Sequence, residues 1–200
     1  MARRAYFAFH YQNDIWRVNQ VRNSWVTQDH ESAGFYDASL WEEAKKQSDL
    51  GIKRMINSGL QNTSVTCVLI GSETSKRRWV QYEIIKSFDK GNALLGVYVN
   101  ELKDQDGKTS AKGANPFDYL AIYTSSDGKS ASVKVWKNQK WIDYEDYPKV
   151  EINYNLQHAN KFYQLSQLGI RMYDWSSNDG YSNFDSWIET SIKEKDNGKY

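Results

Sequence analysis

The feature that most constrains this fold is a pair of apolar runs on either side of one amphipathic segment. The runs are Ser64–Ile70 and Ala93–Val99. Between them, Val80, Ile84 and Phe88 recur at i, i+4 and i+8, a spacing that predicts a helix with one buried face. A nearly continuous apolar run is typical of a strand that is covered on both sides. Together the three segments predict a right-handed βαβ unit within a parallel sheet.

The rest of the chain continues this alternation of strands and helices. A first strand is expected at Ala5–Tyr11, where Phe7 and Phe9 alternate with other mostly apolar side chains. Five further helices are expected: from Asn13 or Asp14 to about Thr27, from a cap at Ser39 to Gly59, within Ser75–Gly91, near His158–Leu168 and over about Asn183–Ile192. The further extended segments are an entry to Phe117–Tyr123, a hairpin at Ser130–Tyr144 and a short strand at Ile170–Tyr173. The predicted class is α/β, with a parallel sheet flanked by helices.

Length and apolar content favour one domain. The chain has 200 residues, of which 40% are hydrophobic and 14% aromatic, enough for one sizeable core. We therefore expect residues 1–200 to form a single domain, with the hairpin at about 130–144 as an insertion and not a second core. Residues 101–115 are polar and without periodicity, which predicts a surface loop. Residues 193–200 are expected to form a frayed, flexible tail.

Charge and cysteine content disfavour several classes of partner. Lys and Arg number 26 against 25 Asp and Glu, so the net charge of +1 gives no field that would attract nucleic acid or a membrane surface. No run approaches the roughly 20 apolar residues of a membrane-spanning helix, and the N-terminal apolar stretch is too short for a signal peptide. Cys67 is the only cysteine and lies in an apolar run. It predicts a buried thiol in a cytoplasmic protein without disulfides.

Motifs for the common nucleotide, metal and nucleophile sites are missing from the sequence. In a parallel sheet, ligands bind beyond the carboxyl ends of the strands, so the segments to search follow Tyr11, Ile70 and Val99. Neither G-x-G-x-x-G nor the P-loop pattern occurs, and no G-x-S-x-G supplies a serine nucleophile. The three histidines lack metal-ligand spacing, so we predict no metal site.

One pair of residues on the helix of the βαβ unit is not explained by core packing. Trp79 and Glu83 stand four residues apart, at the rim of the face made by the buried positions. A partly desolvated carboxylate there could stabilise a positive charge or hold sugar hydroxyls, and the indole could stack on a flat heterocycle. Alternatively, Trp79 covers the core and Glu83 pairs with a cation such as Arg78 or Lys86. Spacing by itself favours this structural interpretation.

Six motifs spread over roughly residues 4–187 carry a resemblance to a known family. They are F-A-F-H-Y, D-A-S-L-W-E-E-A-K-K, S-V-T-C-V-L-I-G-S-E-T, R-R-W-V-Q-Y-E-I, N-P-F-D-Y-L and Y-D-W-S-S-N-D-G-Y. Together they resemble the ThsB family, the TIR-like proteins of Thoeris anti-phage defence. The resemblance implies a flavodoxin-like TIR fold. It gives no role for the predicted hairpin, which smaller TIR domains lack.

The resemblance also implies an activity and partners. Members of the family sense phage infection and convert NAD, as substrate and not as cofactor, into a cyclic ADP-ribose isomer. This diffusible signal activates a partner effector that depletes NAD. By this resemblance the chain is an NAD glycohydrolase or ADP-ribosyl cyclase type of enzyme that responds to a phage-derived trigger and self-associates.

Site residues follow from the same resemblance, position by position. Catalytic TIR domains carry an essential glutamate on the helix after the third strand and a tryptophan four residues before it, a pattern that Glu83 and Trp79 match. Further candidate substrate-binding residues come from the end of the first strand and from the loop and cap before the second helix. They are Phe9, His10, Tyr11, Asp37 and Ser39.

A competing hypothesis belongs to a different class of protein. The chain could be a non-catalytic TIR-like adaptor that binds a phage component and a partner protein, with Trp79 and Glu83 purely structural. A third hypothesis, a simple nucleotide-binding flavodoxin-like module, is disfavoured because the phosphate loop is missing.

Overall fold

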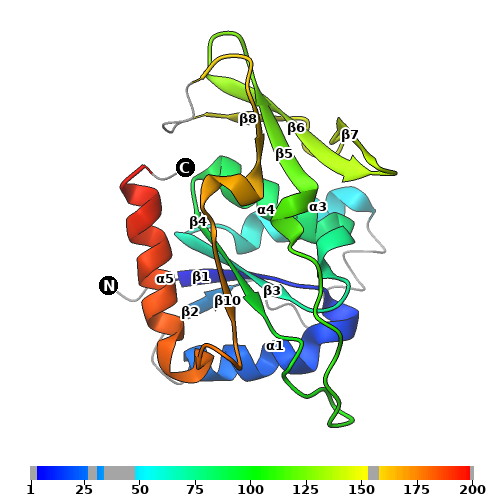
Figure 1. Cartoon of the computed structure of the whole chain (residues 1–200), viewed down its shortest axis with the longest axis vertical. Helices are drawn as coiled ribbons and strands as arrows, with labels where there is room; N and C mark the ends of the chain where they lie inside the picture. Colours follow the sequence, from blue (N-terminus) through cyan, green and yellow to red (C-terminus); the bar gives the residue numbers. More distant parts are fainter. Residues whose placement is uncertain (1–3, 27–30, 34–47, 153–157, 199–200) are drawn as a thin grey trace.

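Five parallel strands form the central sheet of the protein. The computed structural model describes residues 4–26, 31–33, 48–152 and 158–198 (Figure 1). The sheet contains β1 (Arg4–Ala8), β2 (Glu31–Ala33), β3 (Val65–Ile70), β4 (Ala93–Tyr98) and β10 (Arg171–Asp174), in the order β10-β4-β3-β1-β2. This order is that of a flavodoxin-like doubly wound sheet, so the predicted α/β class is confirmed.

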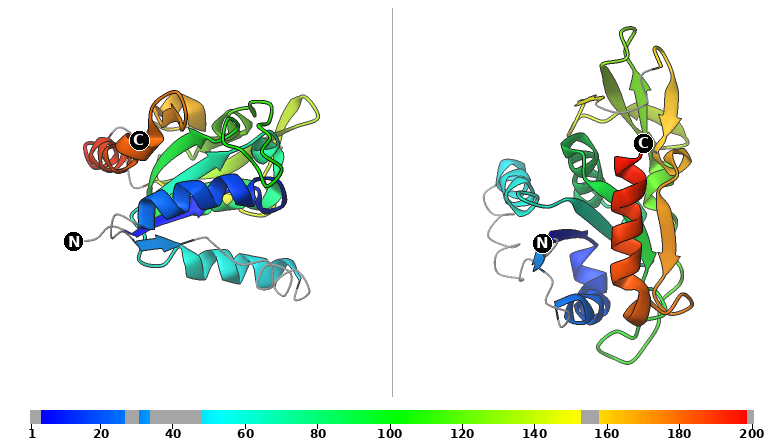
Figure 2. Two further views of the ribbon diagram at one scale, coloured as in Figure 1. Left: turned by 90° about the horizontal axis from the view of Figure 1, so that it is seen from below. Right: turned by 90° about the vertical axis from the view of Figure 1, so that its left-hand side faces the viewer.

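Two pairs of helices cover the two faces of this sheet (Figure 2). Helices α1 (Tyr11–Val26) and α5 (Gly180–Asp196) pack on one face, and α3 (Asp49–Gly59) and α4 (Arg78–Lys90) lie on the other. Each face has its own cluster of buried apolar side chains. Strand β3 is fully buried and lies between the two clusters. Its apolar run predicted this burial on both sides.

Strand β1 is shorter than its sequence pattern predicted. It ends at Ala8, and helix α1 already begins at Tyr11. The backbone N–H of Asp14 donates to the carbonyl of His10, so Asp14 lies inside the first helical turn and is not a cap. Phe9 and Tyr11 nevertheless join the same apolar cluster, which is why the apolar pattern of a strand continued beyond the real end of β1.

A second, antiparallel sheet covers the outer side of α4. It contains β5 (Leu120–Thr124), β6 (Ser130–Lys137), β7 (Lys140–Asp143), β8 (Lys149–Glu151) and β9 (Phe162–Gln164), in the order β7-β6-β5-β9, with β8 also paired to β6. The predicted hairpin is therefore present as β6 and β7, but within a larger sheet. Its inner side chains share the apolar cluster of α4, so helix α4 lies between two sheets (Figure 1).

The predicted helix near His158–Leu168 is wrong. In the described part of this range, Phe162–Gln164 pairs with β5 as strand β9. A short 3-10 turn, Leu165–Leu168, follows and ends at Gly169, whose positive φ of 78° terminates it. Hydrogen bonding to the free edge of β5 outweighed the helical preference of this segment, because tertiary pairing routinely overrides local propensity.

The remaining helix predictions hold in part. Helix α3 ends at Gly59 as expected, while its predicted start at Ser39 lies outside the described residues. Helix α5 is longer than predicted at both ends, running from Gly180 to Asp196. The side chain of Cys67 is fully buried, and this burial raises the pKa of its thiol, as expected of an unreactive core cysteine.

No helix in the part of the chain that the structure describes is long and apolar enough to cross a membrane.

Candidate functional site

The carboxyl ends of β1 and β3 mark the position where this sheet reverses its winding. The two strands are neighbours, with Ala8 level with Val68. After β1 the chain enters α1 on one face, and after β3 it enters α4 on the other face. Ligands of open parallel sheets bind in the crevice that such a reversal creates. Two groups of buried ionisable side chains lie around these strands.

Glu83 is the central residue of the first group. It lies in the second turn of α4 and is only 6% exposed. The hydroxyl of Tyr6, on β1, donates a 2.7 Å hydrogen bond to Glu83 Oε1. Among the described residues, no cation pairs with Glu83, although the structural interpretation required one. Arg78 instead pairs with Asp49 and Asp146.

Burial dominates the acidity of Glu83. It raises the pKa of the carboxyl group from 4.5 to about 8, and the hydrogen bond from Tyr6 opposes this rise. A carboxyl group without a cationic partner is thus held mostly protonated at neutral pH. Binding of a cationic ligand next to it would favour the ionised form. This is the behaviour of a base or charge-stabilising group whose pKa lies close to the working pH.

Trp79 lies one turn before Glu83 on the same helix and is partly buried. The guanidinium of Arg78 lies over the indole, 4.5 Å from the ring centroid. Tyr82 approaches edge to face at 6.1 Å. These contacts hold the indole in place. Since Arg78 covers one face of the ring, a stacking heterocycle would use the other.

Helix α4 holds this pair rigidly between the two sheets. As predicted, Val80, Ile84 and Phe88 are buried. The hydroxyl of Thr66 on β3 donates to Ser87 at 2.8 Å, and the hydroxyl of Tyr144 donates to the carbonyl of Arg78 at 3.1 Å. The helix is thereby attached to both sheets, which suits a site that needs fixed geometry.

A second group lies where β1 and β3 end. Asp14 is 1% exposed; its Oδ1 lies 3.6 Å from Arg17 Nη1, and Thr74 Oγ1 donates to its Oδ2 at 3.4 Å. Burial raises the pKa of Asp14 to about 6, against the effects of Arg17 and Thr74. Gly71 is required beside it, because a Cβ there would lie 2.2 Å from the carboxylate oxygens.

His10 belongs to this second group. It is 8% exposed, and its Nδ1 has no hydrogen-bond partner among the residues with described positions. Burial, and after it the charge of Arg77, lowers the pKa of His10 to about 4. The imidazole is therefore neutral at pH 7 and can accept or donate a hydrogen bond, as a substrate-binding residue would.

Phe9 and Tyr11, two further predicted site residues, belong to a different apolar cluster from the partner of Glu83. Phe9 and Tyr11 lie 6.2 Å apart between ring centroids and pack in the apolar cluster on the α1 and α5 face, whereas the partner of Glu83, Tyr6, belongs to the opposite cluster. Asp37 and Ser39 lie outside the described residues.

Sequence reasoning missed two residues, Tyr6 and Asp14. The period of two in β1 could have identified Tyr6, because it places Tyr6 and Ala8 on one face and Phe7 on the other. Asp14 was interpreted only as a helix cap. No local pattern reports that a helix residue faces a loop sixty positions later in the chain.

Comparisons with known proteins agree with this architecture. The family described as "Thoeris protein ThsB, TIR-like domain" matches residues 6–104, which include β1, β3, α4 and both groups of buried residues. One relative is a protein of Bacillus cereus (strain MSX-D12) named "Putative cyclic ADP-D-ribose synthase ThsB1". It is 53% identical over 192 residues, covering 94% of this chain and 100% of the relative. This chain therefore belongs to the ThsB family of TIR-like Thoeris proteins.

Proposed function

We propose that this chain converts NAD into a cyclic ADP-ribose isomer and releases nicotinamide, with Glu83 as the catalytic residue. The observation that carries the proposal is the buried Glu83 carboxyl group, which has a hydrogen-bond donor in Tyr6 but no cation among its described neighbours. A cationic substrate would supply the missing charge. The name of the 53% identical relative, a cyclic ADP-D-ribose synthase, supports the same reaction class.

The proposed chemistry is a glycosyl transfer. The bond between the ribose C1′ and the nicotinamide nitrogen breaks, and its electron pair leaves with neutral nicotinamide. No strong general acid is needed, because the leaving group is already cationic in NAD. The ribose develops oxocarbenium character, which the ionised Glu83 stabilises. A hydroxyl group of the same ADP-ribose then attacks C1′ and gives up its proton, for which Glu83 is the acceptor.

Tyr6 and Trp79 have supporting roles in this proposal. Tyr6 positions Glu83 and stabilises its ionised form through the 2.7 Å hydrogen bond. Trp79 stacks its indole on the nicotinamide ring. Exclusion of water from the buried carboxylate favours attack by the internal hydroxyl over hydrolysis.

The biological setting follows from family membership. We propose that the cyclic product is a diffusible signal to a Thoeris effector. A phage-derived trigger and self-association, both implied by the resemblance, stay predictions, as do the roles of Asp37 and Ser39.

Incubation of the purified protein with NAD tests the proposal. Nicotinamide and ADP-ribose products are separated by chromatography, with and without lysate of infected cells. We expect nicotinamide and a cyclic product from the wild-type chain and a loss of about 10³-fold or more in Glu83→Gln. Glutamine retains the shape of the side chain and can still accept the hydrogen bond from Tyr6, so the folded structure should persist.

Two outcomes would contradict the proposal. A well-folded Glu83→Gln protein with full activity would remove Glu83 from the reaction. A wild-type chain that forms neither nicotinamide nor an ADP-ribose product, even with the infected lysate, would favour the non-catalytic adaptor.

A further inference from the structure

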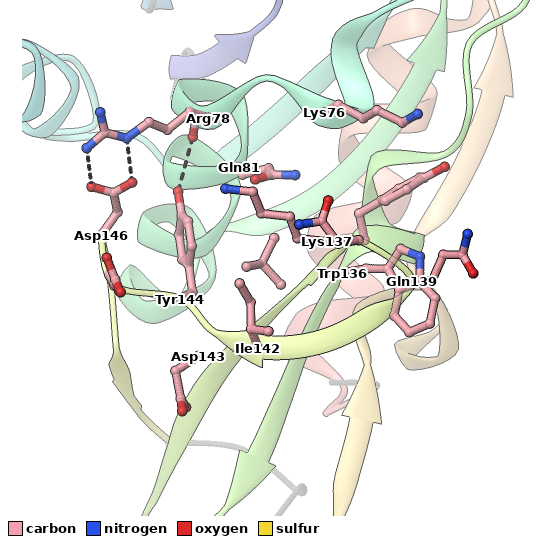
Figure 3. Close-up of a pocket in the computed structure, with 14 residues that line it drawn as sticks. Lys76, Arg78, Gln81, Trp136, Lys137, Gln139, Ile142, Asp143, Tyr144 and Asp146 are labelled. Carbon is pink, nitrogen blue, oxygen red and sulfur yellow. Dashed lines mark hydrogen bonds and ion pairs between the residues drawn. The ribbon is translucent and has the colours of Figure 1, made fainter.

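A cavity of about 780 Å³ lies between the start of α4 and the β6–β7 hairpin (Figure 3). Lys76, Arg78 and Gln81 line it from the helix side, and residues 135–139 and 142–146 line it from the second sheet. The volume is in the range of small-molecule sites. Trp79 and Glu83 are not among its lining residues, but Arg78, which lies over the indole of Trp79, is one of them, so the cavity adjoins the site described above.

Apolar side chains and aromatic rings line part of the cavity. Val135 and Ile142 are inner-face residues of the second sheet and form the apolar part. Trp136 is 38% exposed, and its ring is supported by an edge-to-face contact with Trp141 at 5.3 Å. Tyr119 contributes a second, half-exposed ring. A planar heterocycle can stack on such supported rings.

Gln81 gives the cavity a buried polar group. The residue is 7% exposed, and its Nε2 donates to the carbonyl of Ser75 at 3.1 Å. No donor among the described residues bonds to its Oε1. An amide oxygen accepts hydrogen bonds, and an amino group on a ring would supply a donor here.

The charges in the cavity are separated. Lys76 and Lys137 form no ion pair with any residue whose position is described. Asp146, in contrast, accepts hydrogen bonds from Arg78 at 2.6 and 2.7 Å and pairs with Lys53 at 3.1 Å. Figure 3 shows Asp146 on the opposite side of the cavity from Trp136. The two lysines therefore leave positive charge without an ion-pair partner in the lining of the cavity.

Two further carboxylates line the cavity. Asp143 pairs with Lys134 at 2.5 Å, whereas Glu145 has no cationic partner among the described residues. An anionic group would be attracted towards the ammonium groups of Lys76 and Lys137. These charges favour a ligand that combines a ring with an anion.

We propose that this cavity binds a nucleoside phosphate at a site separate from Glu83. The base stacks on Trp136, an amino group of the base donates to Gln81 Oε1, and Lys76 and Lys137 bind the phosphates. This assignment gives the second sheet a function, ligand binding, that does not depend on whether the chain consumes NAD.

Calorimetric titration of ADP into the full chain tests the site. We expect saturable binding that weakens at least tenfold in Lys137→Gln and in Trp136→Ala. Lys140→Gln is the matched control, because Lys140 faces Lys137 across the hairpin but does not line the cavity. Its affinity should stay within twofold of wild type. Circular dichroism checks the fold of each variant.

Separate titrations of adenosine and of pyrophosphate test the two halves of the ligand. Each should bind at least tenfold more weakly than ADP. Pyrophosphate binding as tight as that of ADP would contradict the stacking on Trp136. Absence of saturable ADP binding, or equal affinities in Lys137→Gln and Lys140→Gln, would overturn the site. Weakening in Trp79→Ala alone would place ADP beside Glu83 instead.

Discussion

Glu83 and Asp14 are both buried carboxyl groups beside the central sheet, yet their surroundings differ. Asp14 has a cation, Arg17, and a hydroxyl group, Thr74, against it, and its pKa is raised only to about 6. Among the described residues, Glu83 has the hydroxyl group of Tyr6 as its one side-chain partner, and its pKa is raised to about 8. The pKa of Asp14 rises less for two reasons: Arg17 offsets part of its desolvation, and Glu83 is the more completely desolvated of the two carboxyl groups.

This difference separates a structural carboxylate from a reactive one. Asp14 is ionised at neutral pH with its partner already in place, so it contributes to the packing of α1 against the loop after β3. Glu83 keeps its proton until a cation arrives. A buried ionisable group that has no opposite charge beside it in the fold is a candidate for binding a ligand or reacting with it.

The largest expected effect is the contribution of Glu83 to the pH dependence of the protein's stability. Its pKa is raised from 4.5 to about 8 on folding, so the folded chain retains a proton that the unfolded chain loses. The free energy of unfolding should therefore fall as pH rises from about 4.5 to 8 and then level off. Glu83→Gln cannot ionise, so its stability relative to wild type should rise across this window by a few kcal/mol at most. Urea unfolding at several pH values measures the difference.

A constant difference between Glu83→Gln and wild type over that window would contradict the raised pKa. Glu101→Gln is the matched control, because it makes the same substitution at an exposed position.

Asp14→Asn should show a smaller effect in a narrower window. The pKa of Asp14 rises from 3.8 to about 6 on folding, so the stability of this variant relative to wild type should rise between about pH 4 and 6 and stay constant above pH 6. The same urea experiments give the comparison. If the stabilities of both variants relative to wild type changed over the same pH range, the proposed difference between the carboxyl groups of Asp14 and Glu83 would be contradicted.

The smallest expected effect concerns Tyr6. Tyr6→Phe removes the hydrogen bond that favours the ionised carboxylate, so the pKa of Glu83 should rise further. We expect the acidic limb of the pH–rate profile for NAD consumption to shift upward by about 0.5–1 pH unit, the equivalent of one hydrogen bond. Tyr82→Phe is the control, since its hydroxyl group contacts Asn57 and not Glu83. Identical profiles in both variants would exclude a role for Tyr6 in positioning Glu83.

The fold was predictable where local patterns carry the information. Apolar runs identified β3 and β4, and helical spacing identified α4 with its buried face, because these periodicities follow from backbone geometry alone. The prediction failed at residues 158–168, where β9 exists only because the edge of β5 is available for pairing. It also missed the extent of the second sheet beyond the β6–β7 hairpin.

The candidate site was predictable to a similar degree. Trp79 and Glu83 were found from their spacing and from the resemblance, since both residues lie on one helix. Tyr6 lies 77 positions from Glu83 in the sequence, and no local pattern at either position predicts their contact. The placement of Phe9 and Tyr11 on the opposite face likewise depends on where β1 ends.

The sequence by itself determined the alternation of strands and helices and the position of Glu83 on α4, because both depend on short-range periodicity. Only the tertiary structure decided that Glu83 is buried beside a tyrosine, with no cation paired to it among the described residues, and that the second sheet forms a cavity against α4. Burial and charge compensation depend on residues brought together from distant parts of the chain, and no local pattern contains that information.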